Sequence, residues 1–202
     1  MHSKVFAEFE AICRQRRAGG DVLEVGSMPS PDTLLCLPCL RDAKSKTGIN
    51  LDGSFTMGDF EIGRANANCM SCFADESFDT VLCNSVLEHD RHFWKSIGEI
   101  FRVARAGALI AIGVPGYTVL PVERTLSRAA GALRRAGISG ARLDAMDAST
   151  PTLRIHLYPG DYYRFSPQAV REVFLDGLVE TEVRTVLLPP RIIGAGVKPN
   201  AR

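Results

Sequence analysis

The amino-acid sequence predicts an α/β fold built around a mainly parallel sheet. Short apolar runs with the length and composition of buried strands alternate with stretches in which apolar residues recur every three or four positions. This alternation is typical of strand–helix–strand units with right-handed crossovers. The length of 202 residues favours a single domain over residues 1–202, and a hydrophobic fraction of 46% is sufficient for a real core.

The first half of the chain is expected to hold one helix and four strands. Apolar residues recur at helical spacing over residues 5–13, and Gly19-Gly20 end that helix. Four short apolar runs, each closed by a turn or a polar cluster, are expected to be strands: residues 21–25, 47–51, 60–65 and 78–83. A short apolar segment over residues 33–40, interrupted by Pro38, links the first two.

The second half continues the pattern around one irregular stretch. Between residues 117 and 156 the periodicity loosens, and we interpret this range as an insertion that forms a lid over the carboxyl edge of the sheet. The expected elements on either side of it are a helix over 90–105, a strand over 109–114, a helix over 166–175 and strands over 179–188 and 191–197.

Composition and charge exclude several classes of partner. The net charge of +1 gives no overall electrostatic attraction for nucleic acid or for an anionic membrane. No apolar run approaches the roughly 20 residues of a membrane-spanning helix, and the N-terminus lacks the apolar region of a secretory signal. The six cysteines lie mostly in apolar runs, which suits reduced thiols. These features predict a cytoplasmic protein.

Two C-x-x-C pairs raise the question of a structural zinc site. The pairs are Cys36 with Cys39 and Cys69 with Cys72, and four thiolates can bind zinc. The first pair, however, stands inside LLCLPCL, where thiols behave as small apolar side chains. We therefore predict no metal.

Residues 73–89, FADESFDTVLCNSVLEH, are the most informative stretch. A polar turn leads into a buried-type strand, and polar residues follow where that strand ends. In open α/β sheets, ligands bind outside the carboxyl ends of the strands. The cluster after the strand is therefore a candidate wall of a binding site, and a capped helix start is the alternative interpretation.

Four segments, in order and spacing, resemble motifs of the class I S-adenosylmethionine-dependent methyltransferases, in the branch with an FD-V-LEH middle motif. They are VLEVGS (22–27), TGINLDG (47–53), FADESFDTVLCNSVLEH (73–89) and EIFRVARAGALIAIGVPGY (99–117). The resemblance covers about residues 20–117. It implies a Rossmann-like three-layer sandwich, a mainly parallel seven-stranded sheet with an antiparallel last strand, and S-adenosylmethionine as cofactor.

The resemblance also assigns cofactor-binding positions. The acid after the first strand and its turn would face the cofactor, the second strand's end would bond the ribose, the next loop would hold the adenine, and the central stretch would flank the methionine moiety. The residues at these positions are Glu24, Gly26, Ser27, Asn50, Asp52, Asn66, Ala67, Asn68, Asn84 and Glu88. Two departures are visible: GSMPSP replaces the usual run of spaced glycines, and Asn50 replaces an acid.

Methyl transfer leaves the hard chemistry to the cofactor, so the protein has to position the acceptor in line and exclude water. A base helps when the acceptor is a hydroxyl or an amine. Candidate bases are His89, His156 and Asp161, and the tyrosines of HLYPGDYYRF (156–165) are candidate pocket walls.

The sequence therefore predicts methyl transfer to a small polar metabolite or a saccharide-type hydroxyl. The alternative is a non-catalytic protein with the methyltransferase fold that acts in binding or as a scaffold, because the glycine loop and Asn50 depart from the family. A nucleic-acid methyltransferase is disfavoured, because the motif expected for amino-group methylation of bases is replaced by NSVLEH (84–89). The oligomeric state is left open, with a homodimer as one option.

Overall fold

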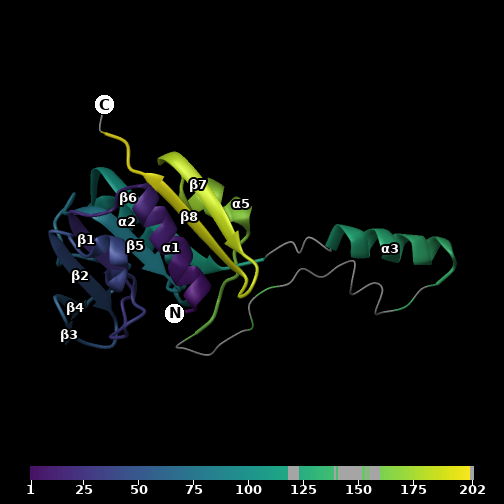
Figure 1. Cartoon of the computed structure of the whole chain (residues 1–202), viewed down its shortest axis with the longest axis horizontal. Helices are drawn as coiled ribbons and strands as arrows, with labels where there is room; N and C mark the ends of the chain where they lie inside the picture. The colour runs from purple at the N-terminus through teal and green to yellow at the C-terminus, as the bar shows by residue number, and fades with distance from the viewer. Residues whose placement is uncertain (118–122, 139, 141–151, 153, 155–159, 201–202) are drawn as a thin grey trace.

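The computed structural model describes residues 1–117, 123–138, 140, 152, 154 and 160–200. An eight-stranded sheet within these residues forms the centre of the molecule, in the order β3-β4-β2-β1-β5-β6-β8-β7 (Figure 1). The strands are β1 (Asp21–Val25), β2 (Ser45–Asn50), β3 (Phe55–Met57), β4 (Phe60–Arg64), β5 (Phe78–Asn84), β6 (Ala104–Pro115), β7 (Val179–Val186) and β8 (Arg191–Val197).

The pairing confirms the predicted α/β class and the mainly parallel sheet. Strands β4, β2, β1, β5 and β6 are parallel neighbours, and β8 runs antiparallel to both β6 and β7. The antiparallel last strand is thus confirmed, but the described sheet has eight strands rather than seven. The additional strand is β3, which pairs with β4 through a tight turn at Gly58-Asp59, with Gly58 at φ +60°.

Helices cover both faces of the sheet and complete the three layers. Helix α1 (Ser3–Gln15) packs on one face together with the 3₁₀ turns η1 (Leu34–Cys36) and η2 (Pro38–Leu40). Helix α2 (Phe93–Val103) packs on the other face with the helical segment formed by α5 (Pro167–Ala169) and η4 (Val170–Phe174). Each helix buries its apolar stripe, as the spacing of its residues predicts. The sheet is therefore a rigid platform for the loops at its edges.

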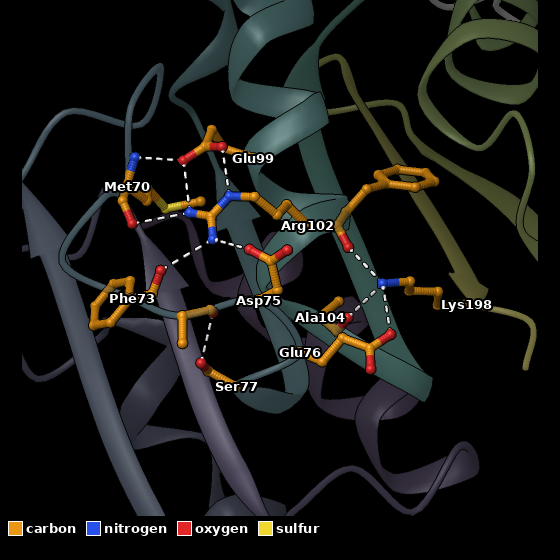
Figure 2. Close-up of polar contacts among 11 residues, drawn as sticks. Met70, Phe73, Asp75, Glu76, Ser77, Glu99, Arg102, Ala104 and Lys198 are labelled. Atoms are coloured by element: carbon orange, nitrogen blue, oxygen red, sulfur yellow. Dashed lines mark hydrogen bonds and ion pairs between the residues drawn. The ribbon is translucent and has the colours of Figure 1, made fainter. Parts of the chain in front are cut away.

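Arg102 of α2 fastens the loop that leads into β5. Its Nε and Nη2 donate to the two carboxylate oxygens of Glu99 at 2.7 and 2.8 Å (Figure 2). Its Nη1 and Nη2 donate to the backbone oxygens of Phe73 and Met70, both at 3.0 Å, and Nη1 also reaches Asp75 Oδ1 at 2.7 Å. These bonds fix the approach of the central stretch to the sheet.

Lys198 stabilises the C-terminal end of α2 through hydrogen bonds to backbone carbonyls. Lys198 Nζ donates to the backbone oxygens of Phe101 and Ala104 at 2.9 and 2.7 Å (Figure 2). The last carbonyl groups of a helix lack partners within it, and a lysine near a helix C-terminus also interacts favourably with the helix dipole.

The insertion contributes one described helix, α3 (Glu123–Arg135). Figure 1 shows α3 standing clear of the sheet. Half of residues 117–156 lie outside the described residues, and the role of this range as a lid stays a prediction. None of the described helices combines the length and hydropathy that crossing a bilayer requires.

Candidate functional site

The predicted site residues follow strands that are neighbours in the sheet. Val25 at the end of β1 pairs with Ile49 of β2 on one side and with Cys83 of β5 on the other. Asn50 at the end of β2 pairs with Arg64 at the end of β4. Because these strands are parallel, their carboxyl ends share one edge, where α/β sheets bind ligands.

Glu24 is buried, and its carboxylate is used by the loop that follows β1. Oε1 accepts a hydrogen bond from the backbone N–H of Leu34 at 3.0 Å, and Oε2 accepts from that of Leu35 at 3.2 Å. Oε2 also accepts from Ser27 Oγ at 3.0 Å and from Thr33 Oγ1. Burial raises the pKa of the Glu24 carboxyl, and the bonds from Thr33 and Leu34 oppose that shift. The acid of the first motif therefore organises residues 27–35.

Gly26 and Ser27 hold that loop against β2. Gly26 has φ +81°, and a Cβ at this position would lie 2.1 Å from Val86 Cγ2. The backbone N–H groups of both residues donate to Ile49 O, at 2.8 and 3.0 Å. A single glycine at Gly26 thus provides the close approach in a segment where the family often has several.

Asn50 joins the first two loops. Its Nδ2 donates to Ser27 O at 2.9 Å, and its Oδ1 accepts from the backbone N–H groups of Asp52 and Gly53 at 2.9 and 3.1 Å. The amide is buried, whereas Asp52 is exposed on the turn. Asn50 therefore supports the shape of the edge, and Asp52 is the residue of the two that faces solvent.

The predicted adenine loop is ordered by its own asparagines. Asn66 Oδ1 accepts from the backbone N–H of Asn68 at 2.9 Å, and Asn68 Nδ2 donates to Ser96 Oγ of α2 at 2.8 Å and to Asp90 Oδ2 at 2.5 Å. Ala67 between them is half-buried and packs against the α2-side core. Asn68 therefore ties this loop to the start of α2.

Two buried oxygens, one at the end of β5 and one in the turn after it, have no hydrogen-bond partner among the described residues. They are Asn84 Oδ1 and Glu88 Oε2. Asn84 Nδ2 donates to Ser85 Oγ at 3.1 Å, and Glu88 Oε1 accepts from Arg191 Nη1 at 3.2 Å. Unpaired buried acceptors are costly, so a ligand that donates hydrogen bonds fits this end of β5.

The candidate bases have different surroundings. His89 Nδ1 contacts Gly160 O, and its Nε2 lies 3.9 Å from Glu88 Oε1. The Asp161 side chain is buried and forms a two-point ion pair with Arg164, in which Nη2 reaches Oδ2 at 2.6 Å. His156 lies outside the described residues, as does Tyr158.

The described aromatic residues of the 156–165 stretch divide between core and surface. Tyr163 and Phe165 pack on Phe93, with ring centroids 5.1 and 5.2 Å apart, and Tyr163 Oη donates to Arg91 O at 3.0 Å. Tyr162 remains 45% exposed, with the Arg91 guanidinium 5.1 Å from its ring centroid. Of these residues, only Tyr162 presents a ring at the surface.

Arg164 and Arg191 are part of this edge, and sequence reasoning did not identify either. Arg191 at the start of β8 is paired with Glu88, 103 positions earlier in the chain. Arg164 binds Asp161. Burial lowers the pKa of Arg191, and Glu88 opposes that shift. No local sequence pattern marks the pair of Glu88 and Arg191, because its members meet only in the folded chain.

The two C-x-x-C pairs pack differently. Cys36 and Cys39 lie partly buried against the α1-side core, whereas Cys69 and Cys72 are exposed on the loop before β5. In the part of the chain that the structure describes, no group of three or more His, Cys, Asp or Glu side chains is arranged to hold a metal ion.

Comparisons with known proteins agree with this fold. A family model described as "Methyltransferase domain" matches residues 38–112. No curated protein matches the chain. A SAM-dependent methyltransferase from Archaeoglobus fulgidus has a similar structure, with a TM-score of 0.63 at 12% identity over 96% of this chain and 93% of that one.

Two other solved structures show how widely this fold is used. A phosphoethanolamine N-methyltransferase from Haemonchus contortus, in complex with S-adenosylhomocysteine, aligns with a TM-score of 0.58 at 12% identity, over 96% of this chain and 53% of that one. The cyclase SpnF aligns with a TM-score of 0.60 at 11% identity, over 97% and 82% of the two chains. The fold, the family-model match over residues 38–112 and the order of the motifs support the resemblance of this chain to the class I S-adenosylmethionine-dependent methyltransferases.

Proposed function

We propose that this methyltransferase acts on a hydroxyl group of a small polar metabolite or saccharide. The observation that carries the proposal is the pair of unpartnered buried oxygens, Asn84 Oδ1 and Glu88 Oε2, beside the loops of β1 and β2. Both accept hydrogen bonds, so they suit a ligand rich in O–H or N–H donors. A hydroxylated acceptor and the ammonium of the cofactor both have such donors.

The cofactor-binding roles rest on the ordered edge of the sheet. The loop of Gly26 and Ser27 would hold the methionine end together with Asn84, and Asp52 is placed for the ribose hydroxyls beside Asn50. The adenine would lie by the loop of Asn66, Ala67 and Asn68. The cofactor supplies, when bound, a methyl group on a sulfonium, and these residues bind and orient it.

Exposed aromatic rings near the same edge support a saccharide-type acceptor. Tyr162 and Trp94 are 45% and 54% exposed, and Trp94 stands in the first turn of α2. Aromatic rings combine a large apolar face with a polar tip and pack against the apolar faces of ring-shaped ligands. The backbone N–H of Tyr162 also donates to Glu88 O at 2.8 Å, so the backbones of these two residues lie side by side.

Several expectations accompany this proposal. They are a single domain with residues 117–156 acting as a lid, a small-molecule partner rather than nucleic acid, a cytoplasmic location and a homodimer as one assembly. The near-neutral net charge of +1 supports a small-molecule partner over nucleic acid, because nucleic-acid binding depends on neutralising phosphates.

A binding or scaffold protein without turnover is the second candidate. It is favoured by Glu24, whose two oxygens are engaged by the loop over residues 27–35 and not presented to a ligand. It is also favoured by the connection between β1 and β2, which contains the 3₁₀ turns η1 and η2. SpnF has a similar structure but is described as a cyclase, so the fold alone does not determine the reaction.

Calorimetry with S-adenosylmethionine and S-adenosylhomocysteine separates the two candidates. The proposed enzyme binds both, and transfer of labelled methyl groups to a panel of methyl glycosides and polyols then identifies the acceptor class. Absence of binding at millimolar cofactor favours the scaffold. Binding without transfer to any hydroxyl, together with transfer to amines or thiols, refutes the proposed acceptor but not the methyltransferase.

A further inference from the structure

We propose that Glu88 accepts the proton of the acceptor hydroxyl and that Arg191 is the residue that positions its carboxylate. The inference rests on the proposed transfer to a hydroxyl group. It gives Glu88, first assigned by resemblance to the cofactor, a catalytic role on the acceptor side.

Only one of the two carboxylate oxygens of Glu88 has a hydrogen-bond partner among the described residues. The side chain is fully buried, Oε1 is bound by Arg191 Nη1 at 3.2 Å, and Oε2 has no partner among the described residues. A buried carboxylate oxygen without a donor loses its hydration without compensation. A ligand hydroxyl that donates to Oε2 would provide the missing bond.

The contacts of Glu88 connect it to the 160–165 segment and to β8. The backbone N–H of Tyr162 donates to Glu88 O at 2.8 Å, and the neighbouring His89 ring contacts Gly160 O. Arg191 comes from β8, beyond β6 in the sheet. The loops that follow β1 and β2 are linked to each other through Glu24, Ser27 and Asn50, and these bonds do not involve Glu88.

Charged groups from several elements face the Glu88 carboxyl and influence its protonation. Arg191 from β8 and His89 from its own turn favour the ionised form, and Arg164, paired with Asp161, adds positive charge from the 160–165 segment. Cys83 of β5 is also near, and its thiol is uncharged because burial raises its pKa well above the usual value. Burial is the strongest influence on Glu88 and raises its pKa. A base is most effective when its pKa lies near the working pH.

The proposed step balances as follows. The acceptor oxygen forms a bond to the methyl carbon while the bond from that carbon to sulfur breaks, and the electron pair of the broken bond stays on sulfur. The hydroxyl proton passes to Glu88 Oε2 and then to water. Asp161 is less suited to this task, because both of its oxygens are bound by Arg164.

The first test compares Glu88→Gln with the matched control Glu76→Gln. Glu76 is an exposed glutamate whose contact is with Lys198, away from this edge. We expect Glu88→Gln to leave S-adenosylhomocysteine affinity within about threefold and to lower methyl transfer by about 10²–10⁴-fold, with loss of the acidic limb of the pH–rate profile. The control should match the wild type in both measurements. Retained activity in Glu88→Gln, or equal loss of cofactor binding and activity, overturns the proposal.

The second test does not depend on turnover. Infrared difference spectra between wild type and Glu88→Gln, recorded across the acid and neutral range, should show one protonated carboxyl that persists above the usual glutamate pKa of about 4.3. Adding a methyl glycoside should shift that band. A carboxyl that titrates in the usual range overturns the proposal, whatever the acceptor. If wild type transfers no methyl group to any hydroxyl but shows the band, the proposed function fails separately.

Removing one member of a buried ion pair can prevent folding, because the other charge is left uncompensated. Circular dichroism therefore accompanies each variant, and Glu88→Gln combined with Arg191→Gln keeps the pair neutral. The double variant should fold and remain inactive. Activity in a folded double variant contradicts the role of Glu88.

Discussion

The carboxylate of Glu24 accepts a hydrogen bond from the backbone N–H of Leu34 at 3.0 Å, across the turn that follows β1. The acid of the first motif is therefore bonded to the protein's own loop. Leu34 begins the short 3₁₀ turn η1, whose first N–H groups have no partner within the turn. Glu24 thus stabilises the loop that the cofactor would have to contact.

Replacing Glu24 with Ala is expected to affect stability and cofactor binding together. The loss of the carboxylate leaves buried N–H and hydroxyl donors unpaired, which should lower the free energy of unfolding by about 1–3 kcal/mol. The disturbed loop should also weaken S-adenosylhomocysteine binding. Urea denaturation and calorimetry measure the two effects. Weaker binding with unchanged stability would instead indicate a direct contact between Glu24 and the cofactor.

Gly113 of β6 is expected to resist substitution because of a close approach within the sheet. A Cβ at this position would lie 2.5 Å from Asn84 Oδ1 and 2.9 Å from the Phe9 ring. Gly113→Ala should therefore lower the free energy of unfolding by about 1–3 kcal/mol, as overpacking of a filled core does. Chemical denaturation measures the change.

Gly63→Ala in β4 is the matched control for that experiment. A Cβ at Gly63 meets nothing nearer than Gly48 O at 4.0 Å. Its effect should lie within about 0.5 kcal/mol of wild type. Equal destabilisation by the two substitutions would show that strand propensity, and not the contact with Asn84, determines the cost at Gly113.

The sequence was sufficient to predict the helix and sheet layers and most of the strands of the sheet. The runs at residues 21–25, 78–83 and 109–114 are continuous apolar stretches, because these strands are buried on both faces, and each is found where expected. Strand β3 was missed because two of its three residues are exposed and it carries no burial pattern. Gly58-Asp59, a tight hairpin turn, was the local signal for it.

The positions of the site residues could be predicted better than their contacts. Resemblance aligned Glu24 and Asn50 with strands that end at one edge, and the register of the sheet places those strands side by side. The partners of these side chains depend on the three-dimensional fold. The bond between Glu88 and Arg191 joins a turn after β5 to the start of β8, and short-range patterns carry no information about it.

Arg102 is expected to be the most sensitive surface residue on α2. Its guanidinium binds Glu99, Asp75 and the backbone oxygens of Met70 and Phe73 at once (Figure 2). Arg102→Ala should lower the free energy of unfolding by about 2–3 kcal/mol, because several partners lose a charged donor. Lysine should recover only part of this, since it lacks the planar fork. Thermal and urea unfolding provide the measurement.

Arg171→Ala is the control for Arg102, because Arg171 is an exposed arginine on the segment η4. Its effect should be within about 0.5 kcal/mol of wild type. A comparable loss at both positions would mean that general helix propensity, rather than the clamp on residues 70–75, explains the result.

Asp21 is expected to make stability depend on pH in the acid range. Its carboxylate binds Lys44 Nζ at 2.9 Å, Ser45 Oγ at 2.7 Å and Arg105 Nη1 at 3.0 Å, and the bond from Lys44 is the main reason that its pKa is lowered. A carboxyl with a lowered pKa in the folded state stabilises the protein above its unfolded pKa of about 3.9, and this contribution is lost as the pH falls through the folded value.

Asp21→Asn should therefore cost about 1 kcal/mol at neutral pH, a small value because Lys44 is largely exposed. The difference in unfolding temperature between wild type and this variant should shrink as the pH falls below about 4, since the wild-type carboxylate is then progressively protonated. Asp42→Asn, at an exposed aspartate near η2, should follow wild type at every pH. Calorimetric scans from neutral to acid pH measure all three proteins, and a difference that grows towards low pH contradicts the direction of the Asp21 shift.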